Sequence, residues 1–417
     1  MKPRLLDHLV CPLDRTRLEL RQWESVDQPL GAADAARAER LGIDSAALSK
    51  EILTGVLINR SRKLLYPIHR GIPRLLTFST GVAQRFADLH IERLRSEFPG
   101  FALPNEPSMP GESDVLRSFS SEWVSYDWDA RSYWNLTPEA WFRCMRFVLE
   151  LDQFPVEGKL ALEVGMGIGG VADYMARREG CEIVGVDLGH AVDAGYQHFG
   201  KNPFLHIAQA SAFAPPFADR TLDFVYSFGV IHHTFSTKTA FDRLARLPVE
   251  NGRLYVWVYS PHDESRTLKR RMLMTMERAL RPMIWRLPDR AQSIALAPLV
   301  PLYIIHQWLR SLRHPEGAVR YGAREALHAA RDRFTPRYIH RHTEEEMCEW
   351  FRAAGYERLT CGSQLSRPRD VPIAFTASTG VSGTRSAAAT KVAASASSNQ
   401  EPTATERRRT PSPLAPG

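Results

Sequence analysis

The stretch ALEVGMGIGG, residues 161–170, is an apolar run that ends in closely spaced glycines. A strand that ends in such a loop lets the backbone approach a bound nucleotide closely, because glycine has no side chain to hold the ligand away. Gly165, Gly167 and Gly170 fit the G-x-G-x-x-G pattern of dinucleotide-binding loops. Gly165, Gly167 and Gly169 fit a second pattern, which is found in loops that bind a different nucleotide. The loop alone therefore leaves the nucleotide undecided.

The chain around this loop alternates between strand-like and helix-like segments from residue 159 to residue 260. Such alternation predicts parallel strands joined by crossover helices on both faces of the sheet. Farther along, residues 342–356 have a helical pattern, and the short segments 357–363 and 371–379 lie close enough to pair as an antiparallel hairpin. We therefore expect an α/β fold, a Rossmann-like doubly wound sheet that is mostly parallel and ends in an antiparallel hairpin.

Two acidic residues near the loop bear on the choice of nucleotide. Glu163 lies two residues before Gly165, where its carboxylate suits a cationic ligand and would repel a pyrophosphate. Asp187 ends the next strand and is placed to accept hydrogen bonds from ribose hydroxyls, which both kinds of nucleotide possess. No second mononucleotide-binding half follows, although a dinucleotide domain needs one. These features favour a ligand with a single nucleoside.

Together with the loop, a second stretch carries a family resemblance. FAPPFADRTLDFVYSFGVIHHT, residues 213–234, and the glycine loop resemble the linked motifs of class I, seven-strand S-adenosylmethionine-dependent methyltransferases. The resemblance implies a methyltransferase that uses S-adenosylmethionine (SAM) as its cofactor. The residues that it assigns to the cofactor site are Glu163, Gly165, Gly167, Gly169, Asp187, Leu188, Ser211, Ala212 and Ser227.

The chain departs from the family pattern at one position, and it offers two candidate catalytic residues. Ser211 stands where the family usually has an acid that receives the adenine amino group, and a hydroxyl accepts a hydrogen bond more weakly than a carboxylate. His232 and His233 follow the fourth strand, at the mouth of the predicted sheet, where a neutral imidazole could act as a general base. The alternative is that these histidines cap a helix and brace the loop through hydrogen bonds.

Residues 1–78 form a predicted small α+β domain. LLDHLVCPLD (5–14) and LLYPIHRGIPRLLT (64–77) resemble the two ends of the zinc-ribbon-like activator subunit of tRNA and translation-factor methyltransferases. Cys11 keeps the first ligand position of that family, but Asp14 stands at the second, and Ile58 and Ser61 fall about where the second pair belongs. Tetrahedral zinc needs four nitrogen, sulfur or oxygen ligands, and Ile58 cannot be one. We expect the fold without a metal.

The remainder of the chain divides by composition. A connecting segment with helical and aromatic stretches spans 79–135, a methyltransferase domain spans 136–378 with a helical insertion at 262–335, and an Ala/Ser/Thr/Pro-rich tail predicted to be disordered spans 379–417. Within the insertion, residues 262–315 interleave basic and apolar side chains. This stretch suits peripheral contact with a membrane surface, a cap over the acceptor pocket, or a contact between copies of the chain.

The distribution of charge limits the kinds of binding partner, and the cysteines indicate the cellular compartment. The formal net charge is +7, and residues 261–320 hold eleven Lys/Arg against five Asp/Glu. A basic excess confined to one segment favours a local anionic partner over nucleic acid bound across the whole surface. Five scattered cysteines and no apolar leader predict a cytoplasmic protein, peripheral at a membrane surface if the insertion docks there.

We expect a small-molecule, glycan or lipid-linked methyl acceptor. The N-terminal module suggests a tRNA or protein methyltransferase as an alternative, and Ser211 suggests a non-catalytic SAM-binding or scaffold protein. An NAD-dependent oxidoreductase is the weakest alternative.

Overall fold

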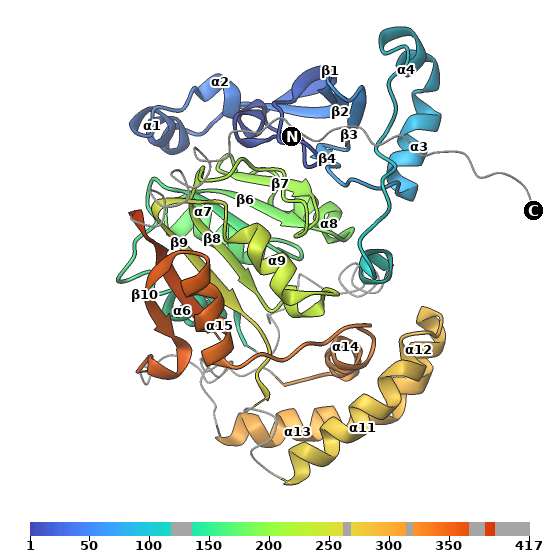
Figure 1. Ribbon diagram of the computed structural model, residues 1–417, viewed down its shortest axis with the longest axis vertical. Helices are drawn as coiled ribbons and strands as arrows, with labels where there is room; N and C mark the ends of the chain where they lie inside the picture. Colours follow the sequence, from blue (N-terminus) through green and yellow to red (C-terminus); the bar gives the residue numbers. More distant parts are fainter. Residues whose placement is uncertain (118–135, 262–267, 314–319, 367–379, 388–417) are drawn as a thin grey trace, which may run out of the picture.

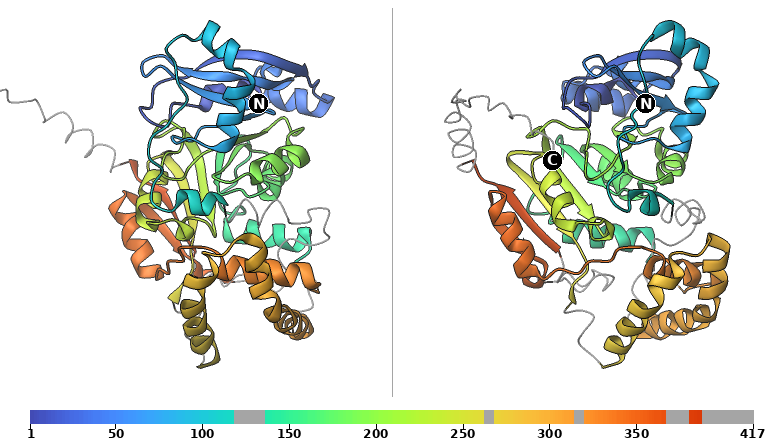
Figure 2. Two further views of the ribbon diagram at one scale, coloured as in Figure 1. Left: turned by 90° about the vertical axis from the view of Figure 1, so that its right-hand side faces the viewer. Right: turned by 45° about the vertical axis from the view of Figure 1, so that its right-hand side comes forward.

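The computed structural model describes residues 1–117, 136–261, 268–313, 320–366 and 380–387. Within these residues the chain forms three tiers (Figure 1): an N-terminal four-stranded sheet, a central seven-stranded sheet, and a group of helices at the opposite end. Two further views show the same order of tiers (Figure 2).

The central sheet has the strand order β10-β11-β9-β8-β5-β6-β7. Pairing is parallel from β7 through β6, β5 and β8 to β9, and β11 is antiparallel to both β9 and β10. The predicted fold class, a mostly parallel doubly wound sheet with an antiparallel end, is confirmed. Its strands are β5 (Leu160–Val164), β6 (Glu182–Asp187), β7 (Leu205–Gln209), β8 (Leu222–Phe228), β9 (Pro248–Trp257), β10 (Tyr356–Cys361) and β11 (Gly380–Arg385).

Helices cover both faces of this sheet because its strands carry apolar side chains on both sides. In β5, Ala161 packs in one buried cluster, whereas Leu162 and Val164 pack in the other. Helices α6 (Pro138–Val148), α7 (Gly170–Arg178) and α8 (Ala191–Phe199) contribute to the first cluster, and α9 (Thr237–Leu244) and α15 (Glu344–Ala353) contribute to the second. Helix α6 begins after Thr137, whose side chain accepts a hydrogen bond from the Ala140 amide.

The last strand corrects the predicted disordered tail, which was placed at 379–417. Gly380–Arg385 is a buried strand, and the 371–379 segment predicted for this role lies outside the described residues. A Cβ atom on Gly383 would lie 2.6 Å from Cδ2 of Leu359, and one on Gly380 would lie 2.5 Å from the Tyr255 hydroxyl. Small residues therefore permit close packing here, although their composition resembles that of a disordered segment.

The N-terminal tier is an antiparallel sheet in the order β1-β2-β3-β4 with short helices at its edges. Its elements are η1 (Pro3–His8), β1 (Glu19–Asp27), α1 (Ala32–Arg40), α2 (Ser45–Leu48), β2 (Lys50–Asn59), β3 (Leu64–His69) and β4 (Ile72–Pro73), and α3 (Gly81–Leu89) and α4 (Ile91–Glu97) follow.

At the predicted ligand positions of this tier, side chains hydrogen-bond to one another. Asp14 accepts hydrogen bonds from Asn59 Nδ2 at 3.0 Å and from Ser61 Oγ at 3.2 Å, and Cys11 Sγ lies 3.3 Å from the Tyr66 hydroxyl. Ile58, which cannot be a metal ligand, is buried in a separate apolar cluster. The neighbouring Asn59 turns toward Asp14 because successive residues of a strand point to opposite faces.

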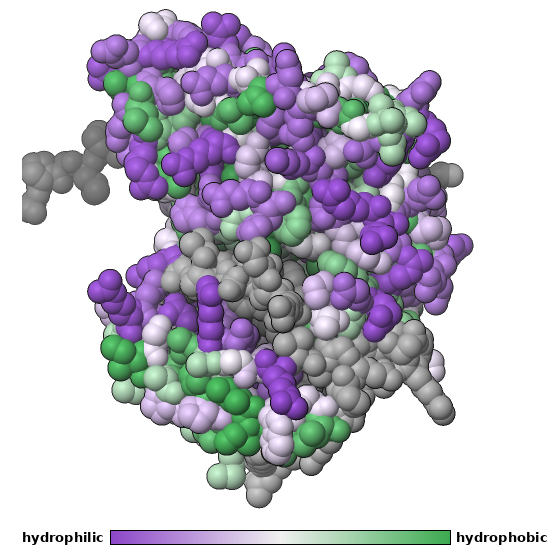
Figure 3. All heavy atoms as spheres, turned by 180° about the vertical axis from the view of Figure 1, so that it is seen from behind, coloured by the Kyte–Doolittle hydropathy of each residue, from purple (hydrophilic) through white to green (hydrophobic). Residues whose placement is uncertain are grey.

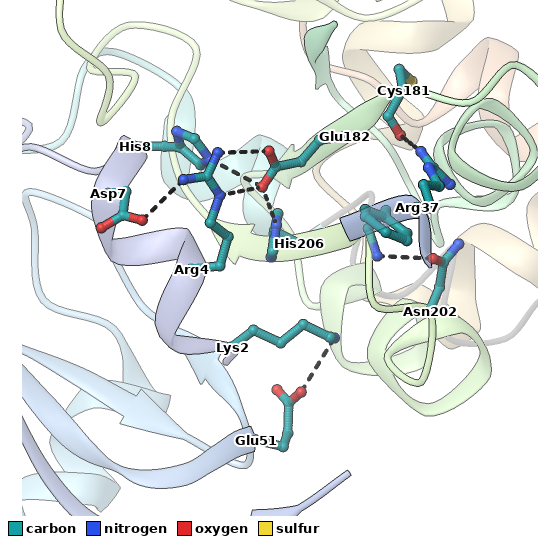
Figure 4. Close-up of polar contacts among 11 residues, drawn as sticks. Lys2, Arg4, Asp7, His8, Arg37, Glu51, Cys181, Glu182, Asn202 and His206 are labelled. Atoms are coloured by element: carbon teal, nitrogen blue, oxygen red, sulfur yellow. Dashed lines mark hydrogen bonds and ion pairs between the residues drawn. The ribbon is translucent and has the colours of Figure 1, made fainter. Parts of the chain in front are cut away.

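The N-terminal tier is joined to the central sheet along the edge strand β7. The amide of Leu75 donates to the carbonyl of Gln209 at 2.8 Å, and one apolar cluster contains Leu5 and Ile68 together with Val184 of β6. Ion pairs flank this apolar contact. Glu182 at the start of β6 receives both Arg4 and His8 from η1, and Lys2 pairs with Glu51 nearby (Figure 4). The two tiers therefore share one core.

The third tier consists of α11 (Leu268–Ile284), α12 (Asp289–Leu296), η3 (Ala297–Leu299), α13 (Val300–Arg313) and α14 (Ala323–Phe334). We call α11 to α14 the helical insertion. Ile284, Leu296, Ala330 and Phe334 form a small core of its own.

Candidate active site

A cavity of about 530 Å³ opens at the carboxyl ends of the parallel strands. Its walls come from the loop after β5, the end of β6, the segments after β7 and β8, helix α6 and the helical insertion. Ligands of open α/β sheets bind at this edge, where the strand order reverses. Here the reversal falls between β5 and β8, and the loops that follow these two strands both line the cavity.

The glycine loop after β5 holds a backbone conformation that other residues rarely adopt. Gly165, Gly167 and Gly169 have φ angles of +81°, +55° and +86°. A Cβ atom on Gly165 would lie 2.3 Å from Cγ2 of Val230, so this position has no space for a side chain. Gly165 and Gly167 line the cavity, whereas Gly169 stands behind it as the left-handed residue that begins α7. The loop thus exposes backbone to a ligand.

Asp187, at the end of β6, is held by the loop itself. Its Oδ2 accepts a hydrogen bond from the Gly167 amide at 3.0 Å, and its Oδ1 accepts one from the Gly189 amide at 2.7 Å. Burial raises the pKa of this carboxyl. Each carboxylate oxygen can accept more than one hydrogen bond, so the group has capacity for ligand hydroxyls. Leu188 beside it also lines the cavity.

Glu163 is a buried carboxyl at the inner end of the cavity. Burial raises its pKa to about 8, and hydrogen bonds from the Tyr226 side chain and the Ala172 backbone offset this rise only in part. A buried carboxylate without a full set of partners is costly, and a cation bound nearby would offset that cost. The arrangement therefore fits a ligand that carries positive charge.

Ser211 and Ala212 line the cavity after β7, and an acid from another part of the chain lies beside them. The hydroxyl of Ser211 donates to Oε1 of Glu112, and Oε2 of Glu112 accepts from the Met109 amide at 2.7 Å. Glu112 is 5% exposed, and burial raises its pKa. The sequence prediction missed Glu112, because it lies 99 residues away in a Pro/Gly-rich stretch. The only signal in the sequence was that Ser211 stands where the family usually has an acid.

The two candidate histidines differ in their placement. His233 lines the cavity, and its Nδ1 lies 3.1 Å from the carbonyl oxygen of Tyr338. Because a carbonyl only accepts, Nδ1 carries the proton and Nε2 carries the lone pair. Burial lowers the pKa of His233 to about 4, so the ring is neutral at pH 7. His232 does not line the cavity and packs its ring against Tyr259, with centroids 4.1 Å apart.

The predicted contact of Ser227 with the cofactor is not supported by its position. Its hydroxyl is fully buried and donates to the Val164 carbonyl at 3.1 Å, between β8 and β5. The side chain does not line the cavity. Its place on a central strand, with neighbouring strands on both sides, explains why the hydroxyl pairs with backbone.

The helical insertion closes the far side of the cavity with charged and phenolic groups. Glu277 of α11 is 1% exposed and pairs with Arg333 of α14 at 2.6 Å and with Arg341 at 3.1 Å. Tyr303 of α13 and Asp332 of α14 line the same wall. The insertion therefore caps the cavity, which was one of the alternatives for it.

Comparison with known proteins identifies two families in the chain. Residues 162–256 match the family described as "Methyltransferase domain", and residues 2–71 match the family described as "Trm112p-like protein". These matches confirm the class of domain inferred from the glycine loop and the resemblance seen at the N-terminus.

Two curated relatives and one solved structure illustrate the extent of similarity. The chain is 29% identical over 161 residues to "Probable tRNA methyltransferase 9B" of Mus musculus, covering 37% of this chain and 33% of the relative. It is 28% identical over 105 residues to "Phosphoethanolamine N-methyltransferase 2" of Caenorhabditis elegans, covering 24% of each. The matched part thus spans a third or less of these relatives. A solved Haemonchus contortus phosphoethanolamine N-methyltransferase 2 has a TM-score of 0.38 and 17% identity, covering 62% of this chain and 47% of that one.

Proposed function

We propose that this chain, which joins a class I SAM-dependent methyltransferase domain to a Trm112p-like domain, transfers a methyl group to a small-molecule, glycan or lipid-linked acceptor bound under the helical insertion. The observation that carries the proposal is the placement of Asp187, which the Gly167 and Gly189 amides fix at the mouth of the glycine loop. Glu163 supports it, because a buried acid that lines the cavity suits a cationic cofactor better than an anionic one.

The bound cofactor supplies an electrophilic methyl carbon on a positively charged sulfur. Asp187 would accept hydrogen bonds from the sugar hydroxyls, and ionised Glu163 would stabilise the positive charge. Helices α11, α13 and α14 line the other side of the cavity, where they would shield the acceptor from water and orient it through their charged side chains. His233 also lines the cavity, and its Nε2 would take the acceptor's proton.

The acceptor is identified by transfer of label. Purified chain incubated with methyl-labelled SAM and separated lipid, glycan, small-molecule, RNA and protein fractions should label a component of one of the first three. Binding of SAM without transfer to any fraction would indicate a non-catalytic SAM-binding protein. Absence of SAM and S-adenosylhomocysteine binding in calorimetry would refute the proposal altogether.

An RNA acceptor is the second candidate. It is favoured by the 29% identity over 161 residues to a relative named as a probable tRNA methyltransferase, together with the Trm112p-like match. Label in the RNA fraction, lost on ribonuclease treatment, would select this candidate over the first.

His233→Asn tests the role of the histidine in the transfer step. Asparagine Nδ2 can replace imidazole Nδ1 as donor to the Tyr338 carbonyl, but it provides no nitrogen equivalent to Nε2. We expect kcat to fall about 100-fold or more, while SAM affinity and melting temperature stay close to those of the wild type. A variant with wild-type kcat would show that His233 only braces the loop.

Glu163→Gln should flatten the dependence of stability on pH. Burial raises the folded-state pKa to about 8 from 4.5, so the stabilisation that depends on the protonated carboxyl is complete below pH 4.5 and is lost as the pH rises to about 8. Glutamine stays neutral, so the melting temperature of the variant should fall less between about pH 5 and about pH 9.

The same variant should also bind SAM about 10- to 100-fold more weakly, because an ionised group that faces the cation is lost. Wild-type SAM affinity should rise with pH up to about 8, since only ionised Glu163 attracts the cation. Parallel pH profiles in the wild type and the variant would contradict this role of Glu163.

Glu112 is expected to supply the acid that position 211 lacks. Glu112→Ala should weaken SAM binding roughly tenfold, the cost of one hydrogen bond to a charged group. Adding Ser211→Asp to that variant should recover most of the affinity, because the new carboxylate would occupy nearly the same place. Titration calorimetry of the single and double variants measures both effects. A double variant as weak as Glu112→Ala would contradict the substitution of one acid by the other.

A further inference from the structure

The outer surface of the helical insertion is unusually apolar. Among the described residues, fourteen large hydrophobic side chains are exposed, and eleven of them lie between Met272 and Leu312. Figure 3 shows hydrophobic side chains gathered at the bottom of the molecule, over this insertion. An exposed apolar surface of this kind marks a site of interaction. We call these eleven side chains the apolar face: Met272, Met276, Leu280, Met283, Leu287, Ile294, Leu302, Ile305, Trp308, Leu309 and Leu312.

The apolar face consists of ordered stripes along two helices. On α11 and the turn after it, five of its members recur at intervals of four, four, three and four residues, which keeps them on one side of the helix. On α13, Leu302, Ile305, Leu309 and Leu312 recur at intervals of three, four and three. The opposite sides of the same helices face inward, where Glu277 and Tyr303 line the cavity. Each helix therefore contributes a polar side chain to the cavity and a stripe of exposed apolar side chains to the outside.

The charges beside the apolar face indicate what covers it. Residues 268–313 contain nine Lys/Arg and two Asp/Glu. Arg271, Arg278, Arg286 and Arg290 are exposed, whereas Glu277 is buried in its ion pairs. A helix with an apolar stripe flanked by arginines lies in the interface of an anionic bilayer, with its apolar side chains among the acyl chains and its arginines at the phosphates. No helix within the described ranges is long and apolar enough to cross a bilayer.

We propose that the apolar face and its arginines dock the protein on the surface of an anionic membrane. The arginine excess distinguishes this occupant from a second copy of the chain, whose equivalent surface would carry the same positive charge. Docking would place α11 and α13, which also line the cavity, against the lipid. Binding to lipid does not depend on methyl transfer, so the two can be tested separately.

Vesicle flotation of the full chain tests the proposal. The protein should float with vesicles of phosphatidylcholine and phosphatidylglycerol, should float much less with phosphatidylcholine alone, and should be released by high salt. Ile305→Asp combined with Leu309→Asp should lower the partition coefficient about tenfold or more, because two apolar side chains leave the acyl region. Leu89→Asp is the matched control, since Leu89 is 71% exposed on α3, away from the insertion, and its replacement should leave flotation unchanged.

Two outcomes would overturn the proposal. One is equal or absent flotation with both kinds of vesicle. The other is a stable dimer in light scattering that Ile305→Asp with Leu309→Asp dissociates, which would show that a second copy covers the apolar face. Circular dichroism of the double variant, with an unchanged spectrum, would confirm that lost flotation does not reflect unfolding.

Discussion

Replacement of Asp187 by alanine should lower the affinity for SAM and S-adenosylhomocysteine by at least about 100-fold. Two charge-assisted hydrogen bonds to sugar hydroxyls would be lost, each contributing about 1.5–3 kcal/mol. The Gly167 and Gly189 amides would also lose their acceptor, so the glycine loop would lose the contact that fixes its shape. Titration calorimetry with S-adenosylhomocysteine measures the loss without requiring an acceptor.

A matched control separates this effect from a general change of charge. Asp152→Ala removes an acid whose side chain is 77% exposed and which pairs only at the surface with Arg146, so its binding constant should equal that of the wild type. If Asp187→Ala bound S-adenosylhomocysteine within a few-fold of the wild type, the ribose contact assigned to Asp187 would be wrong.

Replacement of Glu182 by alanine should destabilise the whole chain by about 3–5 kcal/mol, the usual cost of removing one partner of a buried ion pair. Glu182 binds Arg4 through two hydrogen bonds of 2.9 Å, and His206 Nε2 lies 3.0 Å from the same carboxylate. These partners hold the pKa of Glu182 well below its usual range despite its burial. The stabilisation is therefore present above pH 4.5 and is lost as the pH falls further.

Thermal melts at neutral pH should show a decrease of about 5–10 °C for this variant. Asp7→Ala is the control, because Asp7 pairs with the same Arg4 but its side chain is 60% exposed, and its removal should cost less than about 1 kcal/mol. Equal melting temperatures for the two variants would show that the joint between the N-terminal tier and the central sheet does not depend on Glu182. Two separate transitions in the wild type would show that the tiers do not share one core.

The parts of the fold that were predictable from the sequence depend on short-range patterns. The alternation of residues 159–260 predicts the parallel sheet, since the period of apolar residues directly determines strand or helix. The glycine loop and Asp187 lie within 27 residues of each other and follow consecutive strands, so their meeting at one edge follows from the topology. Their roles toward the cofactor remain predictions until binding is measured.

The features that sequence reasoning missed depend on contacts between distant segments. Glu112 meets Ser211 across 99 residues, and no local pattern marks it. The strand Gly380–Arg385 was assigned to a disordered tail because its small residues carry no apolar period, although it enters the sheet between β9 and β10. Ser227 and His232 match a motif in sequence, but neither of them lines the cavity.

The most direct test of the account is titration calorimetry of the purified chain with S-adenosylhomocysteine and, separately, with NADH. The geometry of Asp187 and the glycine loop predicts saturable binding of S-adenosylhomocysteine at one site per chain and no binding of NADH. Binding of NADH at this site, or no binding of S-adenosylhomocysteine, would contradict the central claim that the cavity holds a single nucleoside and not a dinucleotide.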